Sequence, residues 1–234
     1  MNAAIIVAAG QGIRMGARVR KQYLALEGSS VLSHTLGVFD CSPDIHHIYL
    51  VVPEGDMAFC RQVVLPPVAL KKPLTLVTGG VARQDSVWNG IMAVGELDGV
   101  VAIHDGVRPF VTQDQLAACI RGALLHGACI LGIPATDTLK IVTADGVISG
   151  TLDRGNIWLA QTPQVFQYDL IRKAHAHARK EGFTGTDDAM LLENLLGTRI
   201  NILPGSRNNI KITTPEDLLL ARALLKLLSV NQTT

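Results

Sequence analysis

The chain has 234 residues, of which 48% are hydrophobic and 18% are charged. This composition is typical of a globular protein with a sizeable core, and the length fits one domain spanning 1–234. The 21 Lys and Arg residues balance 20 Asp and Glu residues, and aromatic residues make up only 4%. These numbers exclude the basic surplus and the stacking platforms of a general nucleic-acid binder.

The four cysteines lie far apart and form no Cys-x-x-Cys pair, which favours free thiols in a reducing compartment. No stretch reaches the ~18 apolar residues of a membrane span, and the chain begins with an apolar strand pattern rather than a targeting segment. The seven histidines show no zinc-ligand spacing. We therefore expect a cytoplasmic protein with no membrane or nucleic-acid partner.

The first half of the chain alternates predicted strands and helices. Short apolar runs predict strands, and amphipathic segments between them predict helices. The strands are expected at 3–8, 47–52, 74–78 and 100–104, and the helices at 31–39, near 58–64 and at 81–94. Such alternation predicts an α/β fold with a doubly wound, mostly parallel twisted sheet. A capping box at 112–115 then opens a helix to about His126, and a buried strand follows at 128–134.

The pattern changes between 135 and 160. Two short strands are expected at 138–142 and 147–151, joined through Asp145-Gly146, a pair that favours a hairpin turn. Isolated hairpins are only marginally stable, so we expect this arm, about 135–160, to pack on a partner chain. Beyond it the pattern predicts helices at 168–181 and 186–196, a strand at 199–203, and a last helix that begins with Thr214-Pro215.

The glycine-rich segment after the first strand, residues 8–16, carries the strongest functional signal. Its glycines allow the backbone to approach a ligand closely, and successive amides in such a turn form an anion-binding concavity. Arg14 lies within the segment and Lys21 follows it. The spacing fits neither the dinucleotide fingerprint of NAD-binding proteins nor the P-loop. We therefore expect a phosphate-rich ligand of another kind.

Three further polar segments are expected at the same edge of the sheet, where open α/β sheets bind ligands. The loop 79–86 carries a glycine pair and Ser86, which suit a planar base. Asp105 at a strand end suits Mg²⁺, and Arg108 suits a bidentate grip on phosphate. The segment 208–213 is expected to be a strand that carries Lys211 between apolar neighbours. Taken singly, each segment also fits a purely structural role.

Several motifs occur in one uninterrupted order from residue 3 to about 225. They are Ala8-Ala-Gly-x-Gly-x-Arg-Met15, Lys21-Gln-Tyr-Leu24, His104-Asp-Gly-Val-Arg-Pro109, Asp137-Thr-Leu-Lys140, Asp153-Arg154, Gln161-Thr-Pro-Gln164, Thr186-Asp187 and Asn209-Ile-Lys-Ile-Thr213. The glycine-rich motif alone marks only the nucleotidyltransferase superfamily. The ordered set resembles the 2-C-methyl-D-erythritol 4-phosphate cytidylyltransferase family.

This resemblance implies a Rossmann-like nucleotidyltransferase fold with a protruding β-hairpin arm, through which two subunits form a homodimer. It implies that Arg14 and Lys21 are catalytic cations and that Asp105 helps to hold Mg²⁺. The residues it assigns to CTP are Ala8, Ala9, Gly10, Gly80 and Ser86. The substrate-binding residues it assigns are Asp105, Arg108, Thr138, Arg154, Thr162, Thr186 and Lys211, of which Thr138 and Arg154 would serve the neighbouring subunit's site.

The implied reaction joins CTP and 2-C-methyl-D-erythritol 4-phosphate to give 4-diphosphocytidyl-2-C-methyl-D-erythritol and pyrophosphate, in the non-mevalonate isoprenoid precursor pathway. Two alternatives stay open. One is a D-ribitol 5-phosphate cytidylyltransferase, which would share the nucleotide half, and the other is a catalytically silent nucleotide-binding module. One position departs from the family pattern in a way that bears on the rigidity of the loop: Arg20 stands where proline is usual.

Overall fold

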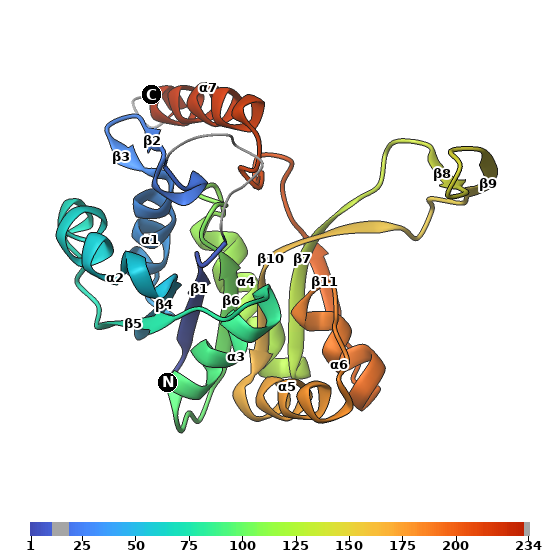
Figure 1. Ribbon diagram of the computed structural model, residues 1–234, viewed down its shortest axis with the longest axis horizontal. Coiled ribbons are helices and arrows are strands. Elements are labelled where there is room, and N and C mark those ends of the chain that lie inside the picture. The colour runs from blue at the N-terminus through green and yellow to red at the C-terminus, as the bar shows by residue number, and fades with distance from the viewer. Residues whose placement is uncertain (11–18, 232–234) are drawn as a thin grey trace.

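The computed structural model describes residues 1–10 and 19–231, with the side chains of 195, 196 and 229–231 left out of the description. Its centre is a seven-stranded sheet in the order β11-β7-β10-β6-β1-β4-β5 (Figure 1). The strands are β1 (Ala3–Val7), β4 (His47–Val52), β5 (Leu74–Thr78), β6 (Val100–Asp105), β7 (Ala128–Pro134), β10 (Trp158–Gln167) and β11 (Asn201–Pro204). The α/β architecture expected from the sequence is therefore confirmed.

The sheet is mixed, because one inner strand runs against its neighbours. β1 is parallel to β4 and β6, β4 is parallel to β5, and β11 is parallel to β7, whereas β10 is antiparallel to both β6 and β7. No strand was expected at 158–167, because the polar run Gln161-Thr162-Pro163-Gln164 interrupts its apolar pattern. The register shifts between Gln161 and Gln164, so this run is an irregularity within the strand.

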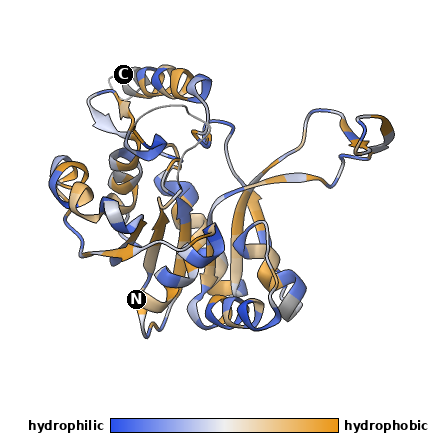
Figure 2. Ribbon diagram, in the orientation of Figure 1, coloured by the Kyte–Doolittle hydropathy of each residue, from blue (hydrophilic) through white to orange (hydrophobic). Residues whose placement is uncertain are grey.

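Apolar side chains cover both faces of the sheet, as the continuous apolar runs of its strands require. Successive residues of a strand point to opposite faces. Ala4 and Ile6 of β1 accordingly join one buried cluster, which includes residues of α1 (Val31–Cys41) and α4 (Gln113–His126). Ile5 joins the other, with residues of α3 (Arg83–Val94), α5 (Tyr168–Glu181) and α6 (Asp188–Leu196). Figure 2 shows these hydrophobic strands between helices with hydrophilic outer faces.

Helix starts follow the capping signals in the sequence. The Thr112 hydroxyl accepts a hydrogen bond from the Gln115 N–H, and the Gln115 side chain accepts one from the Thr112 N–H, so the predicted capping box is present. Asp187 caps α6, which begins at Asp188 rather than at Thr186. The expected helix near 58–64 is a succession of short turns: a 3-10 turn at Glu54–Asp56, α2 (Met57–Phe59) and a π turn at Cys60–Val64.

The C-terminal helix α7 (Pro215–Asn231) packs over a third apolar cluster. That cluster includes Leu26, from the small pair β2 (Ala25–Leu26) and β3 (Ser29–Ser30), and Ile212. The strand expected at 208–213 is wrong, because this segment has no regular secondary structure. Its one backbone contact with the 107 loop, from the Ile212 N–H to the Val107 carbonyl at 2.9 Å, buries Ile212 and leaves Lys211 beside the sheet edge.

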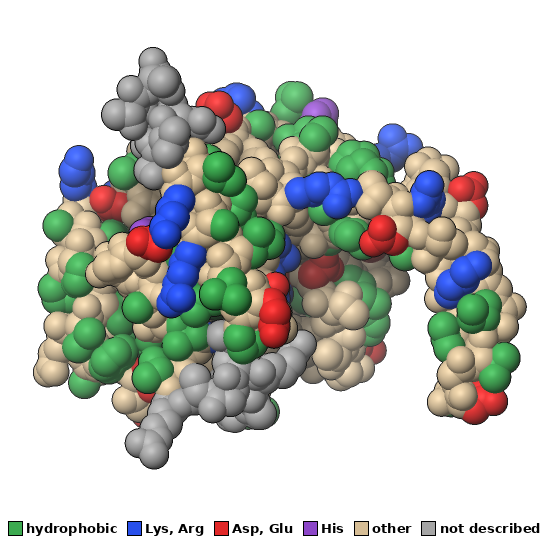
Figure 3. All heavy atoms as spheres, turned by 90° about the horizontal axis from the view of Figure 1, so that it is seen from above, with side chains coloured by type: hydrophobic (Ala, Val, Ile, Leu, Met, Phe, Trp, Pro, Cys, Tyr) green, Lys and Arg blue, Asp and Glu red, His purple; other side chains and the backbone are tan. Residues whose placement is uncertain are grey.

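The arm projects from the body, as Figures 1 and 3 show. Its tip is a separate two-stranded sheet of β8 (Leu139–Val142) and β9 (Ile148–Leu152), close to the predicted hairpin. The arm exposes several large apolar side chains: Ile141, Val142, Val147, Ile148 and Leu152. No helix among the described residues has the length and apolar character needed to cross a membrane.

Candidate active site

The loop after β1 is tied to the segment that carries Lys21. Gln22 is almost fully buried, and its Nε2 donates to the carbonyls of Ala8 at 2.7 Å and Gly10 at 3.3 Å. Ala8 also donates its N–H to the Val51 carbonyl of β4 at 2.8 Å. The backbone of this loop is thus fixed at the carboxyl ends of β1 and β4. Arg14, the other predicted catalytic cation, lies outside the described residues.

The loop 79–86 packs directly against that first loop. A Cβ on Gly79 would collide with the Cβ of Ala9, and one on Gly80 would collide with Asp85. The glycine pair therefore has a packing role in addition to the predicted ligand role. The buried hydroxyl of Ser86 accepts from the Gly80 N–H at 3.0 Å and donates to the Ala82 carbonyl at 3.1 Å, which closes the turn before α3.

Asp105, at the end of β6, is surrounded by cations. Its Oδ2 lies 2.9 Å from Lys211 Nζ and 3.5 Å from Arg108 Nε, and its Oδ1 accepts from Arg83 Nε at 3.3 Å. Burial opposes ionisation, but Arg83 first and then Lys211 hold the pKa of this carboxyl well below its usual range. Burial also disfavours the charged form of Arg108 and therefore lowers the pKa of its guanidinium. The carboxylate is ionised and holds three cations at one point.

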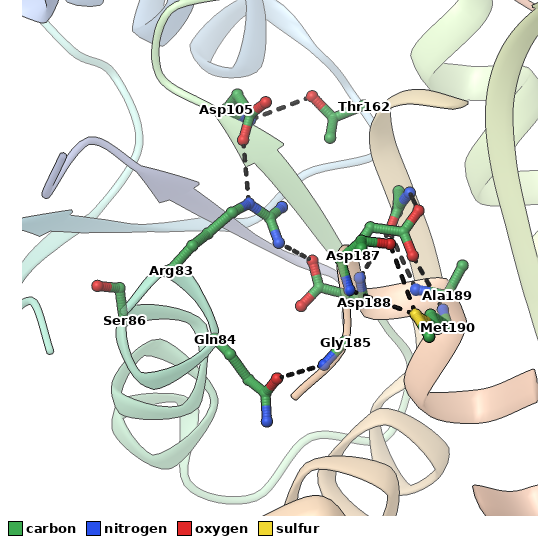
Figure 4. Close-up of polar contacts among 12 residues, drawn as sticks. Arg83, Gln84, Ser86, Asp105, Thr162, Gly185, Asp187, Asp188, Ala189 and Met190 are labelled. Atoms are coloured by element: carbon green, nitrogen blue, oxygen red, sulfur yellow. Dashed lines mark hydrogen bonds and ion pairs between the residues drawn. The ribbon is translucent and has the colours of Figure 1, made fainter. Parts of the chain in front are cut away.

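Arg83 connects this cluster to the interior, as Figure 4 shows. Its Nη1 donates to Asp188 Oδ2 at 2.8 Å, and Asp188 Oδ1 lies 3.1 Å from His175 Nε2. Asp188 and His175 are both fully buried. The next residue, Gln84, accepts from the Gly185 N–H at 3.0 Å and donates to the Phe183 carbonyl at 3.0 Å. The start of α3 therefore holds the 183–188 loop against the cation cluster.

Two adjoining cavities meet at the cation cluster. The larger, about 470 Å³, is lined by the first loop, the 79–86 loop and the Lys21 segment. The smaller, about 240 Å³, lies between β10 and the 186–187 loop. Arg83, Asp105 and Lys211 line both. Of the predicted residues, the first cavity takes Ala8, Ala9, Gly10, Lys21, Gly80, Ser86, Asp105 and Lys211, and the second takes Asp105, Arg108, Thr162, Thr186 and Lys211.

The floor of the smaller cavity is a polar network on the irregular part of β10. The hydroxyl of Thr162 accepts from the Asp105 N–H at 3.1 Å, and the Thr162 carbonyl accepts from Asn209 Nδ2 at 2.9 Å. Gln164 donates to Asp187 Oδ2 at 2.7 Å and accepts from the Asp188 N–H at 3.2 Å. The polar run that hid this strand from sequence analysis is therefore what builds the cavity.

Two predicted residues lie apart from both cavities. Thr138 and Arg154 are exposed at the arm, and neither of them lines either cavity. Arg154 Nη1 donates to the Thr136 carbonyl, and the Thr136 hydroxyl accepts from Arg207 Nη2 at 2.7 Å.

His104 offers no acid–base group to the site. Its ring is fully buried, and its Nε2 lies 3.0 Å from the Arg108 carbonyl. Burial lowers the pKa of His104 to about 4, so the ring is neutral at neutral pH. A neutral ring that donates from Nε2 stabilises the loop 105–108. Phosphate chemistry at this site must rely on the cations.

The sequence model of the 2-C-methyl-D-erythritol 4-phosphate cytidylyltransferase family matches residues 2–227. The chain belongs to this family. The 2-C-methyl-D-erythritol 4-phosphate cytidylyltransferase of Geotalea uraniireducens is 49% identical over 230 residues, covering 97% of each chain. That of Syntrophotalea carbinolica is 50% identical over 222 residues, covering 94% of each. The crystal structure of 4-diphosphocytidyl-2C-methyl-D-erythritol synthase from Anaerococcus prevotii has a TM-score of 0.85, with 30% identity and 96% of each chain covered.

For this member of the cytidylyltransferase family, sequence analysis missed three residues that build the site. Gln22 was quoted only as part of a motif, and Arg83 only as part of a loop. Asp188 was hidden next to Thr186-Asp187, at the start of a predicted helix. One available signal was a charged residue at the start of a helix. Arg83 begins α3, and Asp188 begins α6 next to buried apolar residues. Which charges pair, however, depends on loops 105 residues apart in the chain.

Proposed function

We propose that this chain transfers the cytidylyl group of CTP to 2-C-methyl-D-erythritol 4-phosphate and releases pyrophosphate, with 1–234 acting as one catalytic unit. The observation that carries the proposal is the pair of adjoining cavities that share Arg83, Asp105 and Lys211. Two phosphorylated substrates bound side by side need positive charge at their junction. Family membership supplies the identity of the two substrates.

The larger cavity suits the nucleotide. The backbone of Ala9 and Gly10 lines this cavity at the carboxyl edge of the sheet, where phosphates bind in open α/β folds. Across the cavity, the Gly80 and Ser86 turn offers backbone groups for the polar edge of a base. Lys21 would lie beside the α-phosphate, with Arg14 as its partner. The preference for cytosine follows from family membership.

The smaller cavity suits the phosphorylated acceptor. Arg108 and Lys211 supply positive charge for its phosphate, and a guanidinium matches phosphate geometry by two parallel hydrogen bonds. Thr162 and Thr186 line the same cavity with hydroxyl groups that suit a polyol. The buried Thr162 hydroxyl already accepts from the Asp105 N–H, and an apolar ligand would leave the hydroxyl's own proton without an acceptor, at a cost of about 1–3 kcal/mol.

In the proposed step, a phosphate oxygen of the acceptor attacks the α-phosphorus of CTP. A new bond forms between that oxygen and the α-phosphorus, and the bond from the α-phosphorus to the bridging oxygen breaks. The electron pair leaves with pyrophosphate. Because the nucleophile is already an anion, no general base is needed. The chain's task is to bring two anions together and to neutralise the developing charge, a role that we assign to Lys21 and to Arg14.

A divalent metal fits this site only as a companion of the triphosphate. Among the residues that the structure describes, Asp105 is the one carboxylate that lines both cavities, and three cations already face it. Among the described residues, no group of three or more His, Cys, Asp or Glu side chains is placed to hold a metal. Mg²⁺ usually takes one or two carboxylates together with phosphate oxygens. When bound with CTP, it would supply charge neutralisation at the phosphates, with Asp105 as its protein ligand.

The direct test of the proposal measures pyrophosphate release. With CTP, Mg²⁺ and 2-C-methyl-D-erythritol 4-phosphate we expect turnover, with CTP strongly preferred over ATP and GTP, and we expect a chelator to abolish it until Mg²⁺ is restored. D-ribitol 5-phosphate in place of the acceptor distinguishes the related cytidylyltransferase. Binding of CTP without turnover on either acceptor would favour a silent nucleotide-binding module. Turnover of ATP equal to that of CTP would contradict the assignment of the 79–86 turn.

We further propose a cytoplasmic homodimer in which the arm of each subunit contributes Thr138 and Arg154 to its partner's acceptor site. Two observations support the dimer. The arm exposes apolar side chains that a partner would cover, and Thr138 and Arg154 line neither of the two cavities described above. Twofold dimers are the commonest oligomers. Free cysteines, three of them buried, support a reducing compartment.

Subunit mixing tests this arrangement. Arg154→Ala and Lys21→Ala homodimers should each be weakly active, the first mainly through a raised KM for the acceptor. In a mixed dimer, one site would have both residues intact and the other would have lost both, so mixing should restore activity. If Arg154 served its own chain, every site would keep one defect and mixing would restore nothing. A fully active monomer in sedimentation at assay concentration would also overturn the proposal.

A further inference from the structure

Lys21 lies on a short 3-10 turn, Lys21–Tyr23, which is held from two sides. On its inner side, Gln22 reaches the carbonyls of Ala8 and Gly10, as described above. That contact fixes the turn to the loop after β1, at Ala8 and Gly10. A single 3-10 turn has poor internal hydrogen bonding and does not hold its own orientation. The contacts on its outer side add a second restraint on its orientation beside the larger cavity, and the following inference rests on the proposed role of Lys21.

The outer side is held by one carboxylate oxygen. Asp56 Oδ2 lies 2.8 Å from Arg20 Nε and accepts from the Tyr23 hydroxyl at 3.0 Å. Arg20 and Tyr23 flank the turn at its two ends, while Asp56 belongs to the Glu54–Asp56 turn that follows β4. A single acceptor thus binds the residue before Lys21 and the residue two positions after it.

The Tyr23 end of this contact is well packed. The rings of Tyr23 and Phe59 meet edge to face, with centroids 5.0 Å apart, and the Tyr23 hydroxyl lies 3.4 Å from Cys60 Sγ. Burial, with Cys60 and then Asp56 adding to it, raises the pKa of Tyr23 far above neutral, so the phenol stays a hydrogen-bond donor. The side chain of Asp56 is only 18% exposed, so its contacts are partly shielded from water.

The Arg20 end has a distinctive backbone. Arg20 has φ −61° and ψ 143°, and a proline ring fixes φ near −65°. A proline at this position would therefore hold the same backbone without any side-chain contact. Arg20 has no such ring. Its backbone is restrained by the hydrogen bond from the Tyr23 N–H to its carbonyl at 2.9 Å, and its side chain is held by Asp56.

We propose that Asp56, through Arg20 and Tyr23, is a positioning residue for Lys21, and that the Arg20–Asp56 ion pair gives the turn a restraint equivalent to that of a proline ring at position 20. The Asp56 carboxylate sets the orientation of the Lys21 turn relative to the loop after β1. Its contribution belongs to turnover rather than to nucleotide affinity, because Gln22 and the glycine-rich loop still form the cavity.

The test compares Asp56→Asn, Arg20→Ala and Arg20→Pro with Glu54→Gln, a matched loss of an exposed carboxylate in the same turn. Asn at 56 keeps an oxygen for Tyr23 and removes only the charge that holds Arg20. Asp56→Asn and Arg20→Ala should each lower kcat roughly tenfold, with KM for CTP changed less than twofold. Arg20→Pro should retain kcat within about twofold of wild type, and Asp56→Asn in the Arg20→Pro background should then have little further effect.

A second measurement does not need turnover. Acylation of Lys21 by an amine reagent, followed by peptide mass spectrometry, should be slowed by CTP in wild type and much less so in Asp56→Asn. Arg20→Pro should restore the protection. If wild type shows protection but no pyrophosphate release, the proposed reaction is wrong and the positioning role stands. The positioning role is overturned if Asp56→Asn keeps the wild-type kcat. It is also overturned if Asp56→Asn lowers kcat by the same factor in the Arg20→Pro background as in wild type. A change confined to KM for CTP or to Tm, without change in kcat, also contradicts it.

Discussion

Lys21→Ala is expected to lower kcat by roughly 10²–10³, the usual cost of removing one preorganised charge donor from a transition state. The KM for CTP should rise much less, because the other residues that line the larger cavity, among them Ala9, Gly10 and the 79–86 turn, remain in place. Pre-steady-state and steady-state pyrophosphate release at saturating substrates measures the effect. Arg14→Ala is expected to behave in the same way.

Two comparisons make this result specific. Lys21→Arg keeps the charge but replaces a compact ammonium by a planar guanidinium, so it should recover only part of the lost rate. Lys226→Ala removes a lysine from the C-terminal helix, which lines neither cavity, and should leave kcat unchanged. Near-full kcat in Lys21→Ala would show that the phosphate charge is neutralised elsewhere.

Arg83→Ala is expected to have the largest effect on stability. It leaves Asp188, which is fully buried, without its guanidinium partner, and it removes one of the three cations from Asp105. Removing one partner of a buried ion pair typically costs 3–5 kcal/mol. We expect a loss of about 3 kcal/mol in the free energy of unfolding, at the lower end of that range because 29% of the Arg83 side chain is exposed.

Urea denaturation followed by circular dichroism measures this loss. Arg172→Ala is the matched control, since its pair with Asp169 is exposed at 3.7 Å and surface pairs contribute about 0–1 kcal/mol. Arg83→Lys should recover little, because one ammonium cannot bridge Asp105 and Asp188 as the guanidinium fork does. Equal destabilisation by Arg83→Ala and Arg172→Ala would show that the Asp188 carboxylate finds another partner.

Most of the sheet could be predicted from apolar runs alone. β1, β4, β5, β6 and β7 lie within a residue of their expected positions, because strands buried on both faces need nearly continuous apolar sequence. β10 could not be predicted in this way. This strand pairs with β6 and β7 and also supplies polar side chains to the smaller cavity. Those polar residues interrupt the apolar pattern by which a buried strand is predicted. The segment 208–213 shows the opposite error, a strand predicted where none is found. Ile210, Lys211 and Ile212 alternate as in a strand, but the segment has no regular secondary structure.

The candidate site could be predicted where its residues belong to short motifs that follow predicted strands. Loops at the carboxyl ends of parallel strands meet at one edge, which is why Ala8, Lys21, Ser86 and Asp105 come together. The pairing of charges could not be predicted, because Arg83 selects Asp105 and Asp188 from several acids only once the fold is formed. Nor does one chain's sequence place Thr138 and Arg154, whose expected surroundings belong to a second subunit.

One strand, β10, leaves the arm and continues into the centre of the sheet, where it carries Thr162. Its side chains alternate between the two faces, so inserting or deleting one residue between 155 and 160 would reverse every side chain that follows, unless the irregularity at 161–164 absorbed the change. The hairpin turn at 143–147 has no such constraint, because β8 and β9 pair only with each other among the described residues. Length variation within the family should therefore collect at the tip of the arm and be absent from its base.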